Sequence, residues 1–417
     1  MSYLIHIRPF STYLANQALA TKVVAPPYDS MSSAERLRFS ANHPDNFINA
    51  MRTIEDLPDD LNLSTHELLS ENLSFLKNVL RSYSYTYQPT PCFYVYQLKK
   101  NDFSQTGIVA EVSMVDYQKG AIKGHESTRS DHEGHIYEYL KVVGAVSSPI
   151  CAAHRSTPDI EAIVQESILQ PSLLSFDDDD QVRQTIWAIR DSKKQSKLQE
   201  LFLKVPKIYL TDGHHRVAAG VRYSVDQRFY QAHDNPWDYF LMALFPIDEM
   251  RIMPFNRCVR DTHGLSFDKL MKRLSKAFVV KKLHRSDCDF FGPRRRGEFV
   301  LFFQENFYQL NILPHLVPDD PVTSLDVSLL QDYVLGPILG IENPRTDQRL
   351  DYVVGNKGLD GLVARCQAGW ELGFACYPPS FDELVAVADA SMQMPPKSTC
   401  FDPKARSGVF VRLFNQL

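Results

Sequence analysis

Lys207-Ile208-Tyr209-Leu210-Thr211-Asp212-Gly213-His214-His215-Arg216 is the stretch of this 417-residue sequence that most constrains the fold. Its opening, a lysine followed by an apolar, β-prone run, predicts a short strand. The glycine that follows predicts a tight turn. Val217, Val221 and Val225 then recur at helical spacing. The pattern therefore predicts a strand, a turn and a helix in direct succession.

The turn between the predicted strand and helix has the chemistry of a phosphate-binding site. The first amides of a helix lack partners within the helix, and the helix dipole places positive charge at the same end. Gly213 would let a phosphate approach the backbone, and His214, His215 and Arg216 add donors. The alternative is that Asp212 caps the helix and the basic first turn is solvated. We favour phosphate binding, because basic residues at this end oppose the dipole unless an anion is present.

The composition is that of a globular protein, with 44% hydrophobic and 23% charged residues. The length favours two domains, and we place their boundary near residue 260, which gives residues 1–260 and 261–417. The formal net charge of -5 argues against binding of nucleic acid over a broad basic face. A local basic pocket for a small anion is compatible with this charge.

The sequence predicts no membrane span and no secretory signal. No run approaches the roughly 20 apolar residues that a span needs, and the N-terminal residues lack a basic head followed by an apolar run. The seven cysteines are scattered singly, without a CxxC pair. This spacing favours reduced thiols and a cytoplasmic compartment. We leave open whether the chain forms a homodimer.

Several other elements follow from local patterns. Leucines at helical spacing predict a helix over residues 65–81. Apolar, β-prone runs predict paired strands at 93–96 and 107–112. We also expect a short strand at 22–25, stopped by two prolines, and a last strand at 408–413 that ends the C-terminal region.

A second candidate site is Lys123-Gly124-His125-Glu126-Ser127-Thr128-Arg129. Lys123 and Arg129 are suited to hold phosphates, and Glu126 or His125 to bind a metal or move a proton. The spacing does not match a zinc motif of the H-E-x-x-H kind. A solvated polar loop explains the same composition equally well.

Three further segments have polar chemistry of uncertain role. Asp29 follows Pro26-Pro27-Tyr28, so it is either a rigidly presented general base or the N-cap of a helix over residues 30–39. The tail over residues 394–404 combines prolines, hydroxyls and lysines, and it either closes over an anionic ligand or forms a packed C-terminal turn. The acidic run Asp177–Asp180 predicts a solvated loop.

Taken together, these motifs resemble those of the family known as domain-of-unknown-function 1015. The resemblance covers nearly the whole chain and rests on motifs in a fixed order. They are Arg8-Pro9-Phe10, Val24-Ala25-Pro26-Pro27-Tyr28-Asp29, Asn46-Phe47, Asp116-Tyr117, Ile122-Lys123-Gly124-His125-Glu126-Ser127-Thr128, Thr211-Asp212-Gly213-His214-His215-Arg216, Leu325-Asp326-Val327, and Met394-Pro395-Pro396-Lys397-Ser398-Thr399 continuing to Lys404 and Gly408.

The Asp-Gly-His-His-Arg turn also resembles that of the free-serine kinases, which share a fold with ParB and sulfiredoxin. The resemblance implies a mixed α/β (α+β) fold with a ParB/sulfiredoxin-like nucleotide-binding core and an additional C-terminal α/β region whose tail packs back on the site. The residues implied for the nucleotide are Gly213, His214, His215, Arg216, Lys123, Thr128, Arg129, Lys397 and Thr399. The implied catalytic residues are Asp29, Asp212 and His215, and the candidate metal ligands are Glu126, His125 and Asp212.

We therefore expect a nucleotide-dependent kinase that uses ATP or ADP with Mg²⁺ and phosphorylates a small-molecule hydroxyl, with serine or a serine-like amino acid favoured. Two alternatives stay open from the residues. One is a nucleotide-binding switch without phosphotransfer, and the other is a metal-dependent phosphohydrolase or nuclease. Acceptor-dependent formation of a phosphate ester separates the kinase from both.

Asp29→Asn should preserve nucleotide binding and lower turnover by about 10²-fold, because an amide cannot accept the proton of the attacking hydroxyl. Calorimetry of nucleotide binding and a phosphotransfer assay on the same preparation check the two effects. Full activity in the variant would remove Asp29 as the base.

Overall fold

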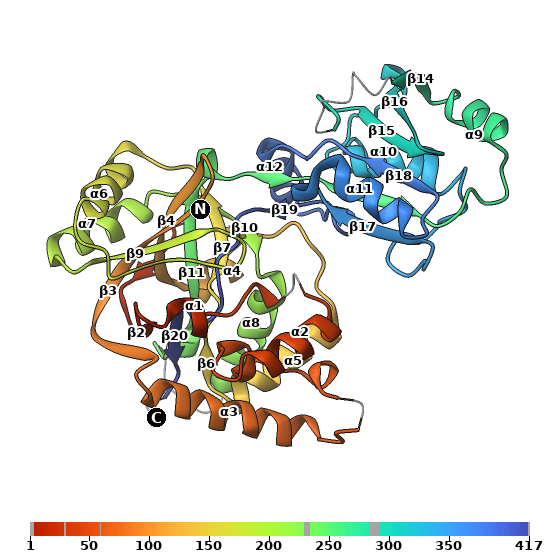
Figure 1. The fold of residues 1–417 in the computed structure, drawn as a ribbon. Helices are drawn as coiled ribbons and strands as arrows, with labels where there is room; N and C mark the ends of the chain where they lie inside the picture. The colour runs from red at the N-terminus through yellow and green to blue at the C-terminus, as the bar shows by residue number, and fades with distance from the viewer. Residues whose placement is uncertain (1–3, 29–30, 59, 229–233, 284–291, 416–417) are drawn as a thin grey trace. The chain divides into compact units, whose positions relative to one another are not determined.

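The structure is a computed structural model that describes residues 4–28, 31–58, 60–228, 234–283 and 292–415. It is a mixed α/β fold with a large mixed sheet, and its contacts divide the chain into two compact units (Figure 1). Unit 1 comprises Met1–Gly124, Thr128–Met250 and Pro403–Leu417, and unit 2 comprises His125–Ser127 and Arg251–Asp402. The chain thus leaves unit 1 twice and returns each time.

Unit 1 is built on a sheet in which twelve strands pair within the described part of the chain. The main path runs β5-β10-β7-β11-β4-β3-β2-β20-β6, with β1 on β4 and with β9 joining β3 to β8. Pairing is parallel for β5 with β10 and for β7 with β11, and antiparallel elsewhere. The strands are β1 Ile7–Arg8, β2 Phe10–Ala15, β3 Tyr85–Lys100, β4 Phe103–Ser113, β5 Ile122–Lys123, β6 Ala145–Val146, β7 Ile150–His154, β8 Leu174–Asp177, β9 Arg183–Ile189, β10 Ile208–Asp212, β11 Tyr239–Pro246 and β20 Phe410–Leu413.

Helices cover both faces of this sheet because its central strands are apolar on both sides. Along β4, Val109 belongs to one buried cluster, whereas Ile108 and Ala110 belong to the other. Helix α3 packs in the first cluster, and α6, α7 and α8 pack in the second. The helices are α1 Ala20–Val23, α2 Ser33–Asn42, α3 Thr65–Arg81, α4 Met114–Gln118, α5 Ser130–Val142, α6 Pro158–Ile168, α7 Ser192–Phe202 and α8 His214–Arg228.

Unit 2 contains a six-stranded sheet in the order β14-β16-β15-β18-β13-β17 and a small pair, β12-β19. Helices α10 and α9 pack in one apolar cluster of this unit, and α11 packs in another. The elements are β12 Ile252–Met253, β13 Phe255–Val259, α9 Phe267–Leu274, β14 Phe278–Leu283, β15 Glu298–Phe303, β16 Asn306–Ile312, α10 Asp326–Leu330, β17 Leu350–Val354, α11 Gly358–Gln367, β18 Leu372–Ala375, α12 Phe381–Asp389 and β19 Cys400–Phe401.

Where local pattern and tertiary packing agree, the predicted elements are confirmed. Helix α3 begins after Ser64, which forms a capping box with Glu67, and it ends at Arg81 as its leucine spacing predicts. Strands β3 and β4 pair antiparallel, with Tyr94 opposite Val109. The stretch from Lys207 to Arg216 forms β10, a turn at Gly213 and the start of α8, as predicted.

Three local predictions differ from the structure; the prediction of a solvated acidic run fails only at Asp178, because Asp177, Asp179 and Asp180 are exposed. Residues 20–23 form the short helix α1 in place of a strand, and only Ala25 makes a β-bridge, to Ser407. In the acidic run, Asp178 is buried and not solvated, because it accepts hydrogen bonds from Arg406 (2.6 Å) and Gln184 (2.7 Å). The strand at the chain end, β20, pairs with β2 and β6 and so belongs to the sheet of unit 1, not to unit 2.

No helix in the described ranges combines the length and apolar character that a membrane span requires.

Arg406→Ala should lower the free energy of unfolding by about 3–5 kcal/mol, because it leaves the buried Asp178 carboxylate without its cation. Urea unfolding followed by circular dichroism measures the change. Arg183→Ala is the matched control, because Arg183 pairs with Asp177 of the same acidic run at an exposed site, where an ion pair contributes little. Equal losses in the two variants would contradict the buried role of Arg406.

Candidate functional site

Parallel pairing of β5 with β10 brings two of the predicted segments together in unit 1. Lys123, at the end of β5, lies opposite Tyr209 of β10, so the residues that follow both strands emerge at the same edge of the sheet. Gly124 lies against the ring of His214, since a Cβ on this glycine would come within 3.1 Å of His214 Cδ2. The missing side chain thus provides the space that the histidine occupies.

The turn at Gly213 is shaped around the side chain of Arg216. Gly213 has a φ of 96°, which favours glycine, and a Cβ at this position would lie 3.0–3.1 Å from atoms of the Arg216 guanidinium. That guanidinium donates to the carbonyls of Ser148 (2.9 Å) and Pro149 (3.0 Å) and pairs with Asp212. Arg216 therefore fixes the loop between β6 and β7 as well as its own turn.

Asp212 is held between two cations. Its carboxylate pairs with Arg216 and, at 3.2 Å, with the ammonium of Lys404 from the C-terminal segment of unit 1. Burial would raise the pKa of Asp212, but the charges of Lys404 and Arg216 outweigh it and lower that pKa to about 2. Asp212 therefore brings two cations together beside the start of α8.

The two histidines of the turn have different surroundings. His214 is buried, and burial lowers its pKa to about 4, so its ring is neutral near pH 7. Nε2 of His215 accepts a hydrogen bond from the backbone N–H of Arg129 (3.0 Å), and its ring centroid lies 5.3 Å from that of His132. His215 thereby joins the start of α8 to the start of α5.

These two helix starts differ in their ability to attract an anion. Helix α5 carries Asp131 and Glu133 in its first turn, and Asp131 pairs with Arg129 at 2.6 Å. Helix α8 has no acidic residue in its first turn. No acidic side chain of its own first turn therefore offsets the positive end of the α8 dipole, in contrast to α5. Thr128 and Arg129 are exposed beside them.

Another group of predicted residues gathers in unit 2. His125 is fully buried, and its Nε2 lies 3.1 Å from Thr399 Oγ1. That hydroxyl also donates to Glu126 Oε1 at 3.3 Å, and the backbone N–H of Met394 donates to the His125 carbonyl at 2.8 Å. Lys397 is exposed, with its ammonium 5.5 Å from the Phe255 ring. The short 125–127 segment is thus bound to the tail motif.

The predicted metal ligands are divided between the units, with Asp212 in unit 1 and His125 and Glu126 in unit 2. Among the residues that the structure describes, no group of three or more His, Cys, Asp or Glu side chains could hold a metal ion. The Mg²⁺ ligands therefore remain a prediction.

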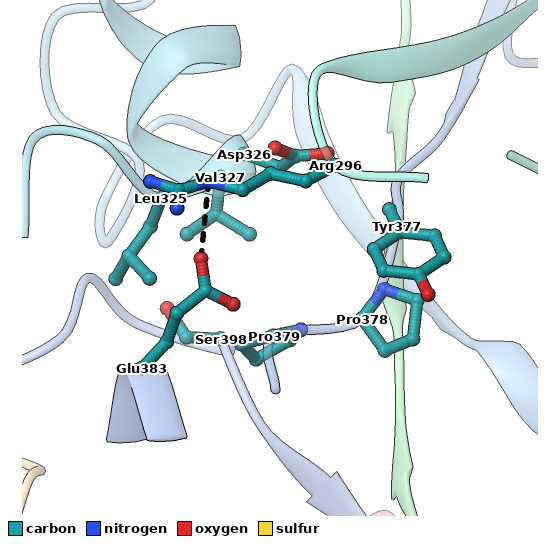
Figure 2. Close-up of a pocket in the computed structure, with 9 residues that line it drawn as sticks. All are labelled: Arg296, Leu325, Asp326, Val327, Tyr377, Pro378, Pro379, Glu383 and Ser398. Carbon is teal, nitrogen blue, oxygen red and sulfur yellow. Dashed lines mark ion pairs between the residues drawn. The ribbon is translucent and has the colours of Figure 1, made fainter. Parts of the chain in front are cut away.

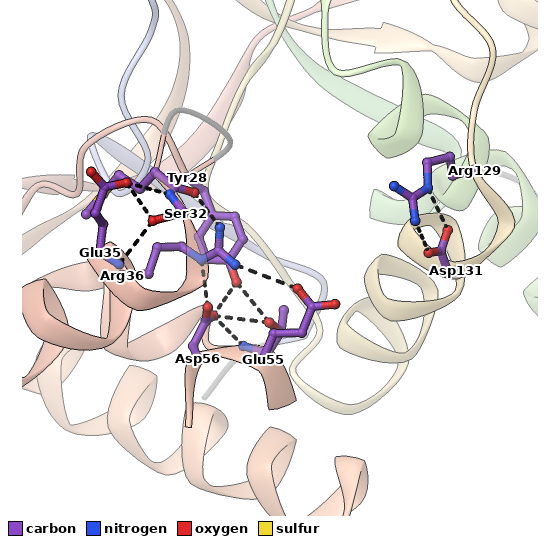
Figure 3. A network of polar contacts seen from close by, with 10 residues as sticks. Tyr28, Ser32, Glu35, Arg36, Glu55, Asp56, Arg129 and Asp131 are labelled. Atoms are coloured by element: carbon purple, nitrogen blue, oxygen red, sulfur yellow. Dashed lines mark hydrogen bonds and ion pairs between the residues drawn. The ribbon is translucent and has the colours of Figure 1, made fainter. Parts of the chain in front are cut away.

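Asp29 lies outside the described residues, but the residues that flank it are well anchored (Figure 3). Tyr28 donates to Asp56, which also pairs with Arg36 at 2.6 Å, and the Arg36 guanidinium lies 4.2 Å from the Tyr28 ring centroid. On the other side, Ser32 is the N-cap of α2. Helix α2 therefore starts at Ser33 and is capped by Ser32.

A small cavity in unit 2 is lined by residues of two further family motifs (Figure 2). Asp326 and Ser398 contribute to it, and Arg296 pairs with Glu383 at 3.1 Å across its edge. Burial raises the pKa of Asp326 to about 7, although the Gly297 N–H donates to its carboxylate. The cavity is too narrow to be a nucleotide site.

Sequence reasoning missed Lys404 as a site residue, although it belongs to the tail motif. Lys404 is the second lysine of that motif, and its position in the motif was the one sequence feature that could have indicated a role. Its partner, Asp212, lies 192 positions away in the sequence. Sequence reasoning also missed the role of Arg129 as the residue whose backbone contacts His215.

The comparisons with known proteins give a family. A family model described as "Protein of unknown function (DUF1015)" matches residues 7–328. No curated protein matches the sequence. Similar solved structures include a free serine kinase in complex with AMP (11% identity, TM-score 0.34, covering 70% of this chain and 86% of that one). They also include SbnI with a C-terminal truncation from Staphylococcus aureus (10%, 0.38, 71% and 84%) and a conserved hypothetical protein from Pyrococcus furiosus (10%, 0.33, 72% and 93%). Likeness at this level does not assign an activity.

Gly213→Ala should destabilise the protein by more than Gly369→Ala. Both glycines have φ near 100°, so each alanine incurs backbone strain on the order of 1–3 kcal/mol. Only at Gly213 does the new Cβ also displace a neighbour, the Arg216 guanidinium, whereas nothing lies within 4 Å at Gly369. Thermal and urea unfolding of both variants measure the difference, and equal losses would contradict the described turn.

Proposed function

The chain belongs to the domain-of-unknown-function 1015 family, and from its turn chemistry we propose that it is a nucleotide-dependent small-molecule kinase. In this proposal the start of α8 binds the phosphates of ATP or ADP. The acceptor is a hydroxyl of a small metabolite, with serine or a serine-like amino acid as the first candidate. The support for that acceptor is the resemblance of the Asp-Gly-His-His-Arg turn to the turn of free-serine kinases.

The observation that carries the proposal is the pair of cations, Arg216 and Lys404, that flank Asp212 beside the start of α8. Helix α8 has no acidic residue in its own first turn, so the positive end of its dipole lies next to these two cations. This combination of backbone donors and cations suits a polyanion such as a nucleotide phosphate.

The residues of unit 1 fit a phosphate in distinct ways. Gly213 exposes the backbone at the helix start, and the amides of His214 and His215 belong to the first turn, where helix amides lack helical partners. Lys404 contributes an ammonium that pairs with Asp212 beside the helix start, while Arg216 positions the turn through Ser148 and Pro149. A bound nucleotide would supply the phosphoryl group that is transferred.

The described residues do not form a ready Mg²⁺ site. Asp212 is ionised, but its charge already faces Arg216 and Lys404. Kinase Mg²⁺ is commonly held by one or two carboxylates together with substrate phosphates. We therefore assign no ligand beyond the candidates Asp212, Glu126 and His125. Asp29 remains the proposed base for the acceptor hydroxyl.

Purified full-length protein incubated with ATP or ADP, Mg²⁺ and a panel of hydroxyl metabolites should form a phosphate ester, with serine giving the highest yield. Phosphorus NMR follows both nucleotide and product. Loss of nucleotide that does not depend on acceptor would identify a hydrolase, and binding without turnover would identify a switch.

Lys404→Met tests the charge argument directly, because it removes one of the two cations at the turn while leaving the Asp212–Arg216 pair. We expect nucleotide affinity by calorimetry to fall at least about tenfold, which corresponds to about 1.4 kcal/mol. Lys22→Met is the matched control, since Lys22 pairs with Asp45 at an exposed site of the same unit. Unchanged affinity in Lys404→Met, with the fold verified by circular dichroism, would contradict phosphate binding at this turn.

A further inference from the structure

Two cysteines meet where helix α11 packs on the sheet of unit 2, far from the proposed phosphate site in sequence. Cys258 lies on β13, directly opposite Gly373 of β18, and Cys366 lies near the end of α11. Both cysteines belong to one buried apolar cluster that also contains Trp370. Neither forms a disulfide in the structure.

The glycine opposite Cys258 explains how the two thiols come together. Side chains of residues that face each other on antiparallel strands share a face and lie about 5 Å apart at Cβ. A Cβ on Gly373 would lie 2.9 Å from Cys366 Sγ, so the Cys366 sulfur occupies the space beside Cys258 that this glycine leaves. The two thiols therefore lie side by side within one apolar cluster.

The pairing makes the two sulfurs chemically unequal. The neighbouring Cys258 thiol lowers the pKa of the Cys366 thiol, and its effect outweighs burial, which acts in the opposite direction. The same contact, together with burial, raises the pKa of Cys258. By comparison, burial raises the pKa of Cys151 to about 12 and that of Cys376 to about 11. Cys366 is therefore the sulfur of the pair that becomes a thiolate first.

The more acidic sulfur also has a route to solvent. Cys366 lines an open cavity of about 340 Å³ together with Phe302, Trp370 and Glu371. Cys258 is fully buried and does not line it. A small oxidant in this cavity would meet Cys366 first and would find Cys258 behind it.

We propose that Cys366 and Cys258 form a hydroperoxide-reactive dithiol site, with Cys366 as the attacking sulfur and Cys258 as the resolving sulfur. The Cys366 thiolate attacks one peroxide oxygen, the O–O bond breaks, and hydroxide leaves and takes up a proton to become water. The Cys258 sulfur then attacks the sulfenic sulfur, the S–O bond breaks, and a second water leaves with the Cys258 proton. Two electrons pass from the sulfurs to the peroxide, and a disulfide joins β13 to α11.

The site is tested on the full chain with hydrogen peroxide, independently of any kinase activity. After brief oxidation and quenching with N-ethylmaleimide, the intact protein should lose two alkylation sites. Peptide mapping should find Cys258 linked to Cys366, and dithiothreitol should restore both thiols. Recovery of both cysteines fully alkylated, or linkage of either one to a different cysteine, would overturn the proposal.

Variants separate the two roles. Cys258→Ala should leave a sulfenic acid on Cys366 that dimedone traps, whereas Cys366→Ser should abolish oxidation of Cys258. Cys400→Ser and Cys288→Ser are the controls and should still form the linkage; Cys288 lies outside the described residues. Dimedone labelling of Cys258 in place of Cys366 would reverse the assignment and refute it. Peptide mapping of the oxidised wild-type protein tests the proposed disulfide even if a variant fails to fold.

Discussion

The ion pairs of Asp212 are the constraint on which the rest of unit 1 depends. A partly buried carboxylate would favour its neutral form, yet Lys404 and Arg216 hold it ionised. Through Arg216 the same group fixes the loop before β7, and through Lys404 it fixes the C-terminal segment. One carboxylate thus joins three segments that are remote in sequence, and the start of α8 is positioned by all of them.

The C-terminal segment repeats this arrangement along its length. Arg406 is buried against Asp178, and Arg412 is buried against Glu111, just as Lys404 faces Asp212. Each cation meets an acid from an earlier part of unit 1, and two of these acids also have another cation: Glu111 pairs with Arg8 and Asp212 with Arg216. Asp178 is the buried acid of the three that depends most on the returning segment, because leaving a buried charge without a partner is costly.

Local patterns predicted the elements whose signal is contained in their own residues. The helix at Thr65–Arg81 has its leucine stripe and its capping box within a few residues, and the strand, turn and helix around Gly213 have theirs. Prediction failed where a distant partner decides the outcome. The local sequence predicts that Asp178 is solvated, but in the structure it is buried and paired with Arg406, 228 positions away. A second failure is local: residues 20–23 form a helix, although their β-branched residues favour a strand.

The candidate site shows the same limit at finer scale. The residue types of the turn at Gly213 are visible in the sequence, but the role of each residue is not. The sequence predicts that Arg216 is a phosphate ligand. In the structure its guanidinium contacts Asp212 and the backbone carbonyls of Ser148 and Pro149, so its main observed role is to position the turn. Lys404 adds a second cation to Asp212, and it comes from the C-terminal segment of unit 1, 192 positions further along the chain. In the proposed site, the positive charge of the turn therefore depends on a residue that lies far from the turn in sequence.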